Sequence, residues 1–279
     1  MPTLSDVTLS ENLVLMAVGK GGSGKSTALG TFPKPMYIFD IDQRIKGMLG
    51  SNILTPEDMK QIDFDFYDTK DGFKKIEDKF IYFSQLYDRR ELKYKTIIIE
   101  SADQLFEMLL IDAFKLKTQN KLVSTLKDAD KKGTNILGQV QIPTPDEYKY
   151  VYACFRTLFY QYFKYFRKCN MILSAGTTPV WAKDPNNENK YAPEIVIGRR
   201  IYAPQGLADL LPRMFDEIYE FCKEETGASK NPLQYRVQFR SDLAKTCFKS
   251  LPNDMILTDK NFYEEWSKKV TPAEVKANA

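Results

Sequence analysis

The chain contains no histidine among its 279 residues. This absence excludes Ser-His-Asp and Cys-His catalysis and any metal site built on imidazole. The four cysteines are scattered without a Cys-x-x-Cys pair, which argues against a zinc site or a disulfide framework and favours a reducing cytoplasm. No run of about 18 apolar residues occurs, so the sequence predicts no membrane span. The first residues also lack the basic start and apolar stretch of a signal peptide.

The composition is that of a globular protein, because 43% hydrophobic and 28% charged residues argue against global disorder. Forty Lys and Arg residues against 37 Asp and Glu give a net charge of +3, which neither requires nor excludes nucleic-acid binding. The length predicts a single large domain over residues 1–279, with a core at about 12–250 and a C-terminal helix and tail over 251–279.

Short apolar runs alternate with segments of helical periodicity along the chain. The predicted strands are 12–18, 36–41, 96–99, 171–174, 217–222, 235–240 and 244–249, the last two forming a hairpin. The predicted helices are 25–31, 71–90, 102–116, 146–168, 207–214 and 261–270. This alternation predicts an α/β fold with a mostly parallel sheet, helices on both faces and an antiparallel C-terminal edge. The polar stretches 119–145 and 176–206 are predicted to be long surface loops.

The strongest motif is a glycine-rich loop that matches GxxxxGK[ST], follows a predicted strand and opens a predicted helix. Its glycines let backbone N–H groups surround phosphates, Lys25 would reach the β- and γ-phosphates, and the Ser26 hydroxyl would bind Mg²⁺. The motif therefore predicts ATP and Mg²⁺ as ligands. The predicted nucleotide-binding residues are Gly19, Lys20, Gly21, Gly22, Ser23, Gly24, Lys25, Ser26 and Thr27.

Acidic residues end two further predicted strands. Glu100 ends the third strand, where a P-loop protein needs an acid to organise Mg²⁺. The second strand ends in Asp40 and Asp42, and either could polarise the attacking water. Because side chains of a strand alternate between its two faces, Asp40 and Asp42 are expected on the same face, and their spacing does not show which one is catalytic. We favour Asp40 because it lies nearer the strand. Thr177, after the fourth strand, is a candidate sensor of the γ-phosphate.

The order of these motifs resembles the RecA-type ATPases, specifically the compact phage-encoded RecA-like single-strand annealing proteins. The resemblance covers roughly residues 12–265 and implies a RecA-like core, ATP hydrolysis, assembly into rings or filaments, and binding of single-stranded DNA in recombination. A single-stranded-DNA-binding protein is a further candidate partner. The segments that carry the resemblance are the P-loop, FPKPMYIFDID (32–42), TIIIES (96–101), NMILSAGT (170–177), GLADLLPRMFDEIYEF (206–221) and LAKTCFKSLP (243–252).

The resemblance also implies roles for individual residues. The catalytic carboxylate maps onto Asp40 or Asp42, the third-strand acid onto Glu100, and a basic residue that reaches a neighbour's ATP onto Lys245. Two departures matter: relatives typically have Asp where this chain has Glu100, and a basic-acidic-basic trio is reduced to Lys245 alone. Slow ATP hydrolysis would agree with both departures.

In RecA-type folds, mobile loops near one edge of the sheet contact DNA, and here the matching loops are 119–145 and 176–206. Basic side chains for phosphates and aromatic rings for stacking are what single strands require. The intervening helix 146–168 is predicted to be mainly core, with surplus aromatics such as Tyr150, Tyr160 and Phe163 at a subunit interface. The predicted DNA-binding residues are Lys131, Lys132, Trp181, Lys183, Lys190, Arg199 and Arg200.

Two other functions stay open at this point. The sequence KGGSGKST also matches the deviant P-loop of the ParA/MinD partition ATPases, in which Lys20 would act across a nucleotide-gated dimer. The IFDIDQ segment resembles the second-strand motif of that group as well. The third possibility is a DNA-binding module that uses ATP as an assembly switch with little hydrolysis.

Overall fold

The computed structural model describes residues 13–49, 53–68, 72–115, 145–166, 168–182, 195–203, 205–225, 233–248, 250–257 and 261–270. The strands are β1 (Val14–Gly19), β2 (Met36–Asp40), β3 (Ile62–Phe66), β4 (Thr96–Glu100), β5 (Asn170–Ala175), β6 (Thr177–Ala182), β7 (Ile195–Ile201), β8 (Glu217–Glu225), β9 (Leu233–Gln238) and β10 (Asp254–Leu257). The helices are α1 (Lys25–Leu29), α2 (Lys46–Leu49), α3 (Pro56–Met59), α4 (Phe73–Asp88), α6 (Pro145–Leu158), α7 (Gln205–Met214) and α8 (Phe262–Val270). Residues 102–115 are also helical, and a π-helical turn, Phe159–Phe163, continues α6.

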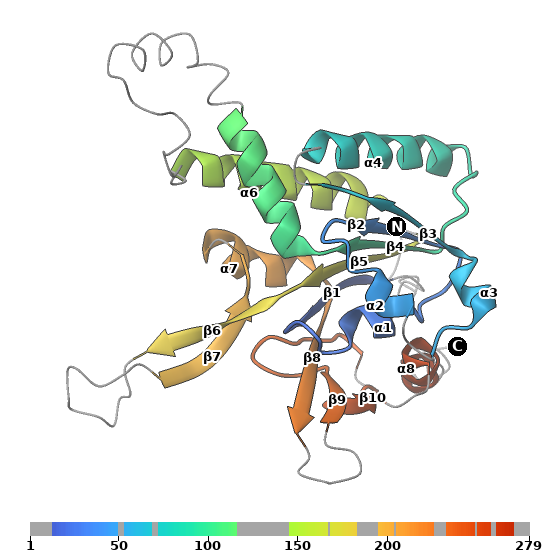
Figure 1. Ribbon diagram of the computed structural model, residues 1–279, viewed down its shortest axis with the longest axis vertical. Helices are drawn as coiled ribbons and strands as arrows, with labels where there is room; N and C mark the ends of the chain where they lie inside the picture. The colour runs from blue at the N-terminus through green and yellow to red at the C-terminus, as the bar shows by residue number, and fades with distance from the viewer. Residues whose placement is uncertain are drawn as a thin grey trace, which may run out of the picture.

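The central sheet has eight strands in the order β10-β9-β8-β1-β5-β4-β2-β3 (Figure 1). The six strands from β8 to β3 in this order run parallel, whereas β9 is antiparallel to β8 and β10 is antiparallel to β9. This is the predicted RecA-like core, a mostly parallel sheet with an antiparallel C-terminal edge. Since parallel strands end at one edge, the carboxyl ends of β1, β2, β4 and β5 come together there.

The sheet is covered on both faces because its strands are apolar on both sides. In β2, Tyr37 and Phe39 belong to one buried cluster, whereas Met36 and Ile38 belong to the other. The first cluster packs against α4, helix 102–115, α6 and α7. The second packs against α1, α2 and α8. The helices of the described segments include none that is both long and apolar enough to cross a membrane.

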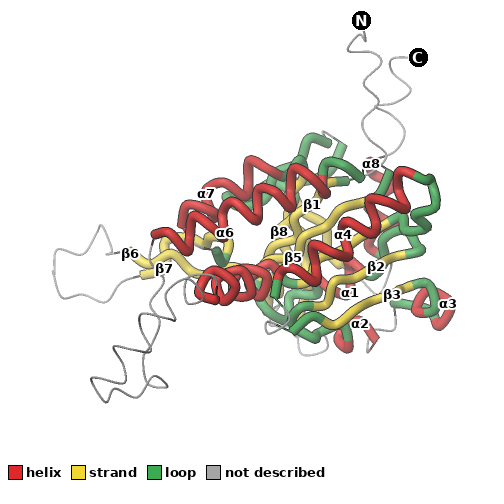
Figure 2. The backbone as a smooth tube through the Cα atoms, turned by 90° about the horizontal axis from the view of Figure 1, so that it is seen from above, coloured by secondary structure: helices red, strands yellow, loops and turns green. Residues whose placement is uncertain are grey.

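Strands β6 and β7 form a separate antiparallel hairpin that projects away from the central sheet (Figure 2). The prediction that 176–206 is one irregular loop is therefore wrong for its described parts. The sequence does not predict the hairpin because its strands show little apolar alternation. Its large apolar side chains are also poorly buried, since Trp181, Val196 and Tyr202 are 55%, 49% and 49% exposed. Residues 183–194, between the two strands, lie outside the described residues.

The predicted strand 244–249 is also wrong over the residues that the structure describes. Only Lys245 makes a β-bridge there, to Ile218 of β8. The strand that follows β9 in the chain and pairs with it is β10, not 244–249, and Met255 lies opposite Val237. The sheet therefore extends past the predicted core boundary at residue 250.

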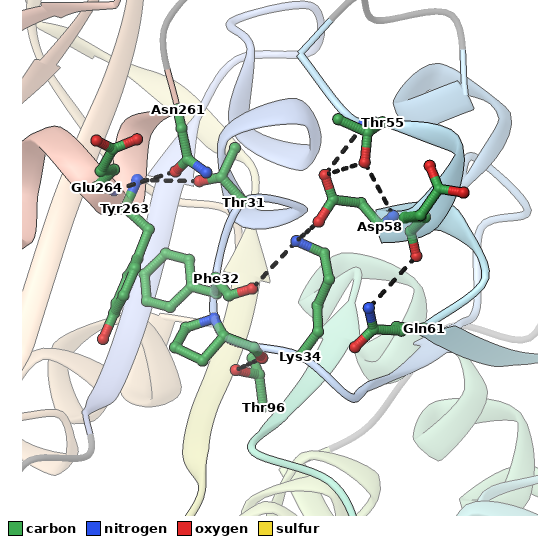
Figure 3. Close-up of polar contacts among 12 residues, drawn as sticks. Thr31, Phe32, Lys34, Thr55, Asp58, Gln61, Thr96, Asn261, Tyr263 and Glu264 are labelled. Atoms are coloured by element: carbon green, nitrogen blue, oxygen red, sulfur yellow. Dashed lines mark hydrogen bonds and ion pairs between the residues drawn. The ribbon is translucent and has the colours of Figure 1, made fainter.

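The C-terminal helix α8 is joined to α1 through Thr31 (Figure 3). The Thr31 Oγ1 atom accepts a hydrogen bond of 3.0 Å from the backbone N–H of Tyr263 and donates one of 2.6 Å to the carbonyl of Ala28. The rings of Phe32 and Tyr263 lie 4.9 Å apart, and Trp266 is buried and donates to the Tyr219 hydroxyl. These contacts make α8 part of the core that supports the carboxyl edge of β1.

Candidate active site

The glycine-rich loop between β1 and α1 approaches the neighbouring backbone closely. A Cβ atom on Gly19 would lie 2.3 Å from the carbonyl oxygen of Phe221 in β8, so only glycine fits there. Gly24 has a φ of +85° immediately before α1, a left-handed conformation that favours glycine. These positions explain two of the glycines that the motif requires.

The Lys25 side chain folds back over this loop. Its Nζ atom donates to the carbonyls of Gly19 and Lys20, at 2.8 and 3.1 Å. Burial lowers the pKa of Lys25, while the negative charges of Glu100 and Asp103 raise it. The ammonium group therefore lies among acids at the carboxyl edge of the sheet, where a nucleotide's phosphates would be received.

Ser26 and Glu100 meet across 74 residues of sequence, as the motif analysis predicts. The Ser26 hydroxyl donates to Glu100 Oε1 at 2.8 Å. Glu100 is 5% exposed, and its Oε2 atom is buried without a hydrogen-bond partner. Burial raises the pKa of Glu100 to about 7, although the bond from Ser26 and the charge of Lys25 lower it.

This pair of oxygen donors suits Mg²⁺, because the ion prefers a hydroxyl and a carboxylate together with phosphate oxygens. The orphaned Oε2 of Glu100 is the observation that supports the fit. Ser26 and Glu100 would hold the ion, which would neutralise charge on the phosphates. No group of three Cys, Asp or Glu side chains suited to a metal occurs in the described part of the chain.

Asp40 and Asp42 have different surroundings. Asp40 is fully buried, and its carboxylate accepts the backbone N–H groups of Arg44 at 3.0 Å and Ile45 at 3.2 Å. Asp42 pairs with the Arg44 guanidinium at 3.2 Å, and its Oδ1 atom is buried without a partner. Burial raises the pKa of both carboxyl groups.

The negative charge of Asp42 raises the pKa values of both Lys25 and Glu100. The two backbone bonds of Asp40 instead hold the turn that leads into α2. Which of the two acids is catalytic stays a prediction. The oxygen of Asp42 without a hydrogen-bond partner favours Asp42, whereas the sequence analysis favours Asp40.

Asp103 is a site residue that sequence reasoning missed. Its Oδ1 atom accepts the N–H of Gly176 at 2.9 Å, and this bond joins the start of helix 102–115 to the end of β5. Thr177, the candidate phosphate sensor, follows directly and has a buried Oγ1 atom without a hydrogen-bond partner. The position of this acid three residues after Glu100 was the available sequence signal for Asp103.

A cleft of about 480 Å³ runs from the P-loop toward the C-terminal part of the chain. Its far wall consists of Tyr235 of β9, Leu257 of β10 and Phe262 of α8. The Tyr235 ring lies directly against the loop, because a Cβ atom on Gly24 would be 3.3 Å from its Cδ1. This apolar wall beside a phosphate-binding loop has the character of a nucleobase pocket. Nothing in the local sequence of these strands signals it.

Lys245 does not lie at the cleft of its own chain. Its backbone pairs with Ile218, which stands opposite Met16, three residues before the P-loop glycine Gly19. At about 3.3 Å per residue, that is roughly 10 Å along the strand. The Lys245 side chain is exposed, so its action on a neighbour's nucleotide stays a prediction. Lys20 is likewise exposed, at the tip of the loop.

The predicted DNA-binding residues are only partly described. Lys131, Lys132, Lys183 and Lys190 lie outside the described residues. Trp181, Arg199 and Arg200 lie on the β6–β7 hairpin, and Arg200 is exposed. Arg199 Nη1 is 4.0 Å from Glu220 Oε1 on β8. The hairpin thus carries one exposed aromatic ring and two guanidinium groups.

The fold and the phosphate-binding loop define a P-loop nucleoside triphosphatase with a RecA-like core. The family model of the AAA domain matches residues 11–230. The chain therefore belongs to the AAA-domain family, whose P-loop ATPases bind and hydrolyse ATP. A comparison with curated proteins found no match. The cleft wall of Tyr235, Leu257 and Phe262 lies beyond the matched residues.

Proposed function

We propose that the protein is a Mg²⁺-dependent ATPase that binds single-stranded DNA and promotes annealing in homologous recombination, like the phage-encoded proteins that it resembles. The observation that carries the proposal is the direct path from the nucleotide cleft to the hairpin. β5 ends at Ala175, opposite Val18 of β1 and next to the start of the P-loop; Asp103 accepts the N–H of Gly176, and β6 begins at Thr177. A nucleotide that changes the position of Asp103 would therefore act on the hairpin.

In this proposal Lys25 binds the terminal phosphates and Asp42 orients the attacking water. Glu100 and Ser26 hold Mg²⁺, and Lys245 of a neighbouring copy in a ring or filament stabilises charge in the transition state. Trp181 and Arg200 on the hairpin supply a stacking ring and a phosphate contact. The support for the hairpin is its exposure next to the site, together with its basic and aromatic side chains.

ATP turnover with and without oligo-dT tests the proposal. Replacing Arg199 and Arg200 by Gln should weaken binding of the strand and flatten its salt dependence by up to about 1.4, since each lost phosphate contact contributes about 0.7 to the slope. Glutamine is chosen because a glutamate at position 199 would repel Glu220. The matched control is Lys60→Gln with Arg89→Gln, two exposed charges on other elements. A wild-type protein that shows no affinity for oligo-dT would refute the proposed DNA function.

A ParA-like dimer remains the second candidate, and the observation in its favour is the exposed Lys20 at the loop tip. Lys20→Ala should abolish dimerisation and turnover if this candidate is right, and should leave DNA-dependent turnover intact if our proposal is right. The third candidate, an ATP switch, predicts nucleotide-dependent DNA binding without turnover. Lys25→Ala, which should lose ATP binding, is the control for all three.

A further inference from the structure

The helix α6 and the π-helical turn after it carry aromatic and basic side chains at every fourth position. We name this row the α6 ladder; it consists of Tyr148, Tyr152, Arg156, Tyr160 and Lys164. Residues four apart are neighbours on a helix surface, about 6 Å apart along the axis at a rise of 1.5 Å per residue. Tyr152 is half-buried and the other four side chains are exposed.

The packing of the helix does not account for this row. The residues that face the core are a different set, all buried: Val151, Phe155, Leu158, Phe159, Tyr162, Phe163 and Phe166. Tyr148 and Tyr160 are 40% and 52% exposed. The prediction that the helix is mainly core is confirmed for one face, whereas a second, solvent-facing row needs another explanation.

The π-helical turn changes how the row winds at its C-terminal end. In an α-helix of 3.6 residues per turn, a row of every fourth residue winds slowly around the axis. The turn Phe159–Phe163 has wider, i to i+5 bonding and winds less per residue, which opposes this drift. Lys164 follows this turn, and its Nζ atom lies 5.9 Å from the Tyr160 ring centre and 5.5 Å from that of the buried Phe159.

The two cations of the ladder lie over aromatic rings of the same helical segment. The Arg156 guanidinium is 5.7 Å from the ring centres of both Tyr152 and Tyr160. Neither Arg156 nor Lys164 forms an ion pair with a carboxylate of the residues that the structure describes. Within the described residues, the ladder thus presents two positive charges with no carboxylate paired to them, beside aromatic rings.

A hollow of about 590 Å³ adjoins the first two rings. It is lined by Tyr148, Lys149 and Tyr152 on α6, and across from them by Gly206 and Leu207 at the start of α7. Its volume lies in the range of pockets that take small organic groups, and its lining is mainly apolar. A flat aromatic base could enter beside the Tyr152 ring, with its phosphate toward Arg156.

From these observations we infer that the α6 ladder is a stacking platform for single-stranded DNA, with bases on its tyrosine rings and phosphates on Arg156 and Lys164. This inference rests on the proposed DNA-binding function and adds a second surface to the β6–β7 hairpin. The favoured occupant is a single strand because only unpaired bases offer faces to rings, and because uncompensated cations suit phosphates.

The first test removes ring faces and keeps apolar bulk. A Tyr152→Leu, Tyr160→Leu double variant should bind labelled oligo-dT at least about tenfold more weakly in fluorescence anisotropy, since stacking contributes strongly for each base. Its affinity for an abasic strand with the same number of phosphates should change little. The matched control is Tyr82→Leu on α4, where the tyrosine is 50% exposed. Circular dichroism and ATP turnover without DNA should equal wild type in every variant.

The second test removes charge. An Arg156→Gln, Lys164→Gln variant should weaken binding to both strands and flatten the salt dependence by up to about 1.4. If the wild type binds oligo-dT and both ladder variants bind it equally well, the ladder inference fails while the proposed function stands. Unchanged DNA affinity with altered sedimentation would identify the ladder as a subunit interface and overturn the inference. A wild type that binds no single strand would overturn both.

Discussion

Asp40 and Asp42 are two residues apart, yet their carboxylates differ in what they can do. Asp40 is engaged by two backbone N–H groups, and an engaged, fully buried carboxylate cannot turn toward a water molecule. Asp42 has one oxygen without a partner and interacts electrostatically with Lys25. At the residue scale, hydrogen bonding rather than distance from the strand separates a structural acid from a candidate catalytic one.

Exchanging each acid for its amide should separate these roles. Asp42→Asn should bind ATP normally but lose turnover about 10²- to 10⁴-fold, because the positioning carboxylate is gone. Asp40→Asn should lower the free energy of unfolding by about 1–3 kcal/mol, because an amide N–H₂ would face a backbone N–H. Steady-state turnover, titration calorimetry and urea unfolding measure the three quantities. Full turnover in Asp42→Asn would return the catalytic role to Asp40.

Glu100 should make stability depend on pH in the absence of nucleotide and Mg²⁺. Burial raises its pKa from 4.5 to about 7, so the folded protein binds this proton more tightly than the unfolded chain. The free energy of unfolding should therefore fall as pH rises from about 4.5 to 7, by up to about 3 kcal/mol, and should level off above that range. Glu100→Gln should lack this component in urea unfolding at a series of pH values. Parallel curves for the two proteins would contradict the assignment.

At the scale of elements, the P-loop forms one wall of the cleft and the C-terminal segments form the wall opposite to it. β9, β10 and α8 contribute Tyr235, Leu257 and Phe262, and the Thr31 bond fixes α8 against α1. These residues oppose the loop across the space where a base would follow the phosphates. We therefore expect the wall to bind the base and the loop to bind the phosphates.

Tyr235→Ala should distinguish these two parts of the cleft. Its affinity for ATP should fall about fivefold to tenfold, as expected for the loss of one aromatic stacking contact. Its affinity for inorganic tripolyphosphate should be unchanged, because Lys25 and the loop are intact. Calorimetry on both ligands is the measurement, and Tyr82→Ala on the exposed face of α4 is the control. Equal losses for both ligands would indicate a distorted loop instead of a base contact.

At the scale of the whole molecule, we predict that Lys245 acts between copies of the chain. It is fixed by a bridge to β8 on the far side of the strand from its own P-loop, and its side chain is exposed. A cation that meets the γ-phosphate only in an assembly would make hydrolysis depend on protein concentration.

Mixing two inactive variants tests this arrangement. Lys245→Ala should bind ATP but hydrolyse it poorly, and adding the Asp42→Asn protein should restore part of the turnover. Recovery follows because some mixed interfaces then combine an intact Asp42 with an intact Lys245. Lys223→Ala, a basic residue of β8 away from the bridge, is the control. Failure to recover, in two variants that still assemble, would exclude a shared site.

Much of the fold was predictable because its signals are local. Four of the parallel strands are apolar runs such as Thr96–Glu100, which are buried on both sides and therefore easy to recognise. Strand β3 is absent from the prediction although Asp63 and Asp65 alternate with Phe64 and Phe66; it lies at the sheet edge, where both rings are exposed. The errors in 176–206 and 244–249 concern antiparallel pairing: β6 and β7 pair with each other as an exposed hairpin, and Lys245 pairs with Ile218 of β8.

The sequence by itself determined the phosphate-binding loop, its lysine and serine, and the acid at the end of β4. These follow from one contiguous motif and from strands that must end at a common edge. Only the tertiary structure decided that Asp40 is held by the following turn, that Tyr235 and Phe262 face the P-loop, and that the α6 ladder faces solvent. The physical reason is that a residue's partners come from elements far away in the chain, and packing alone brings those elements together.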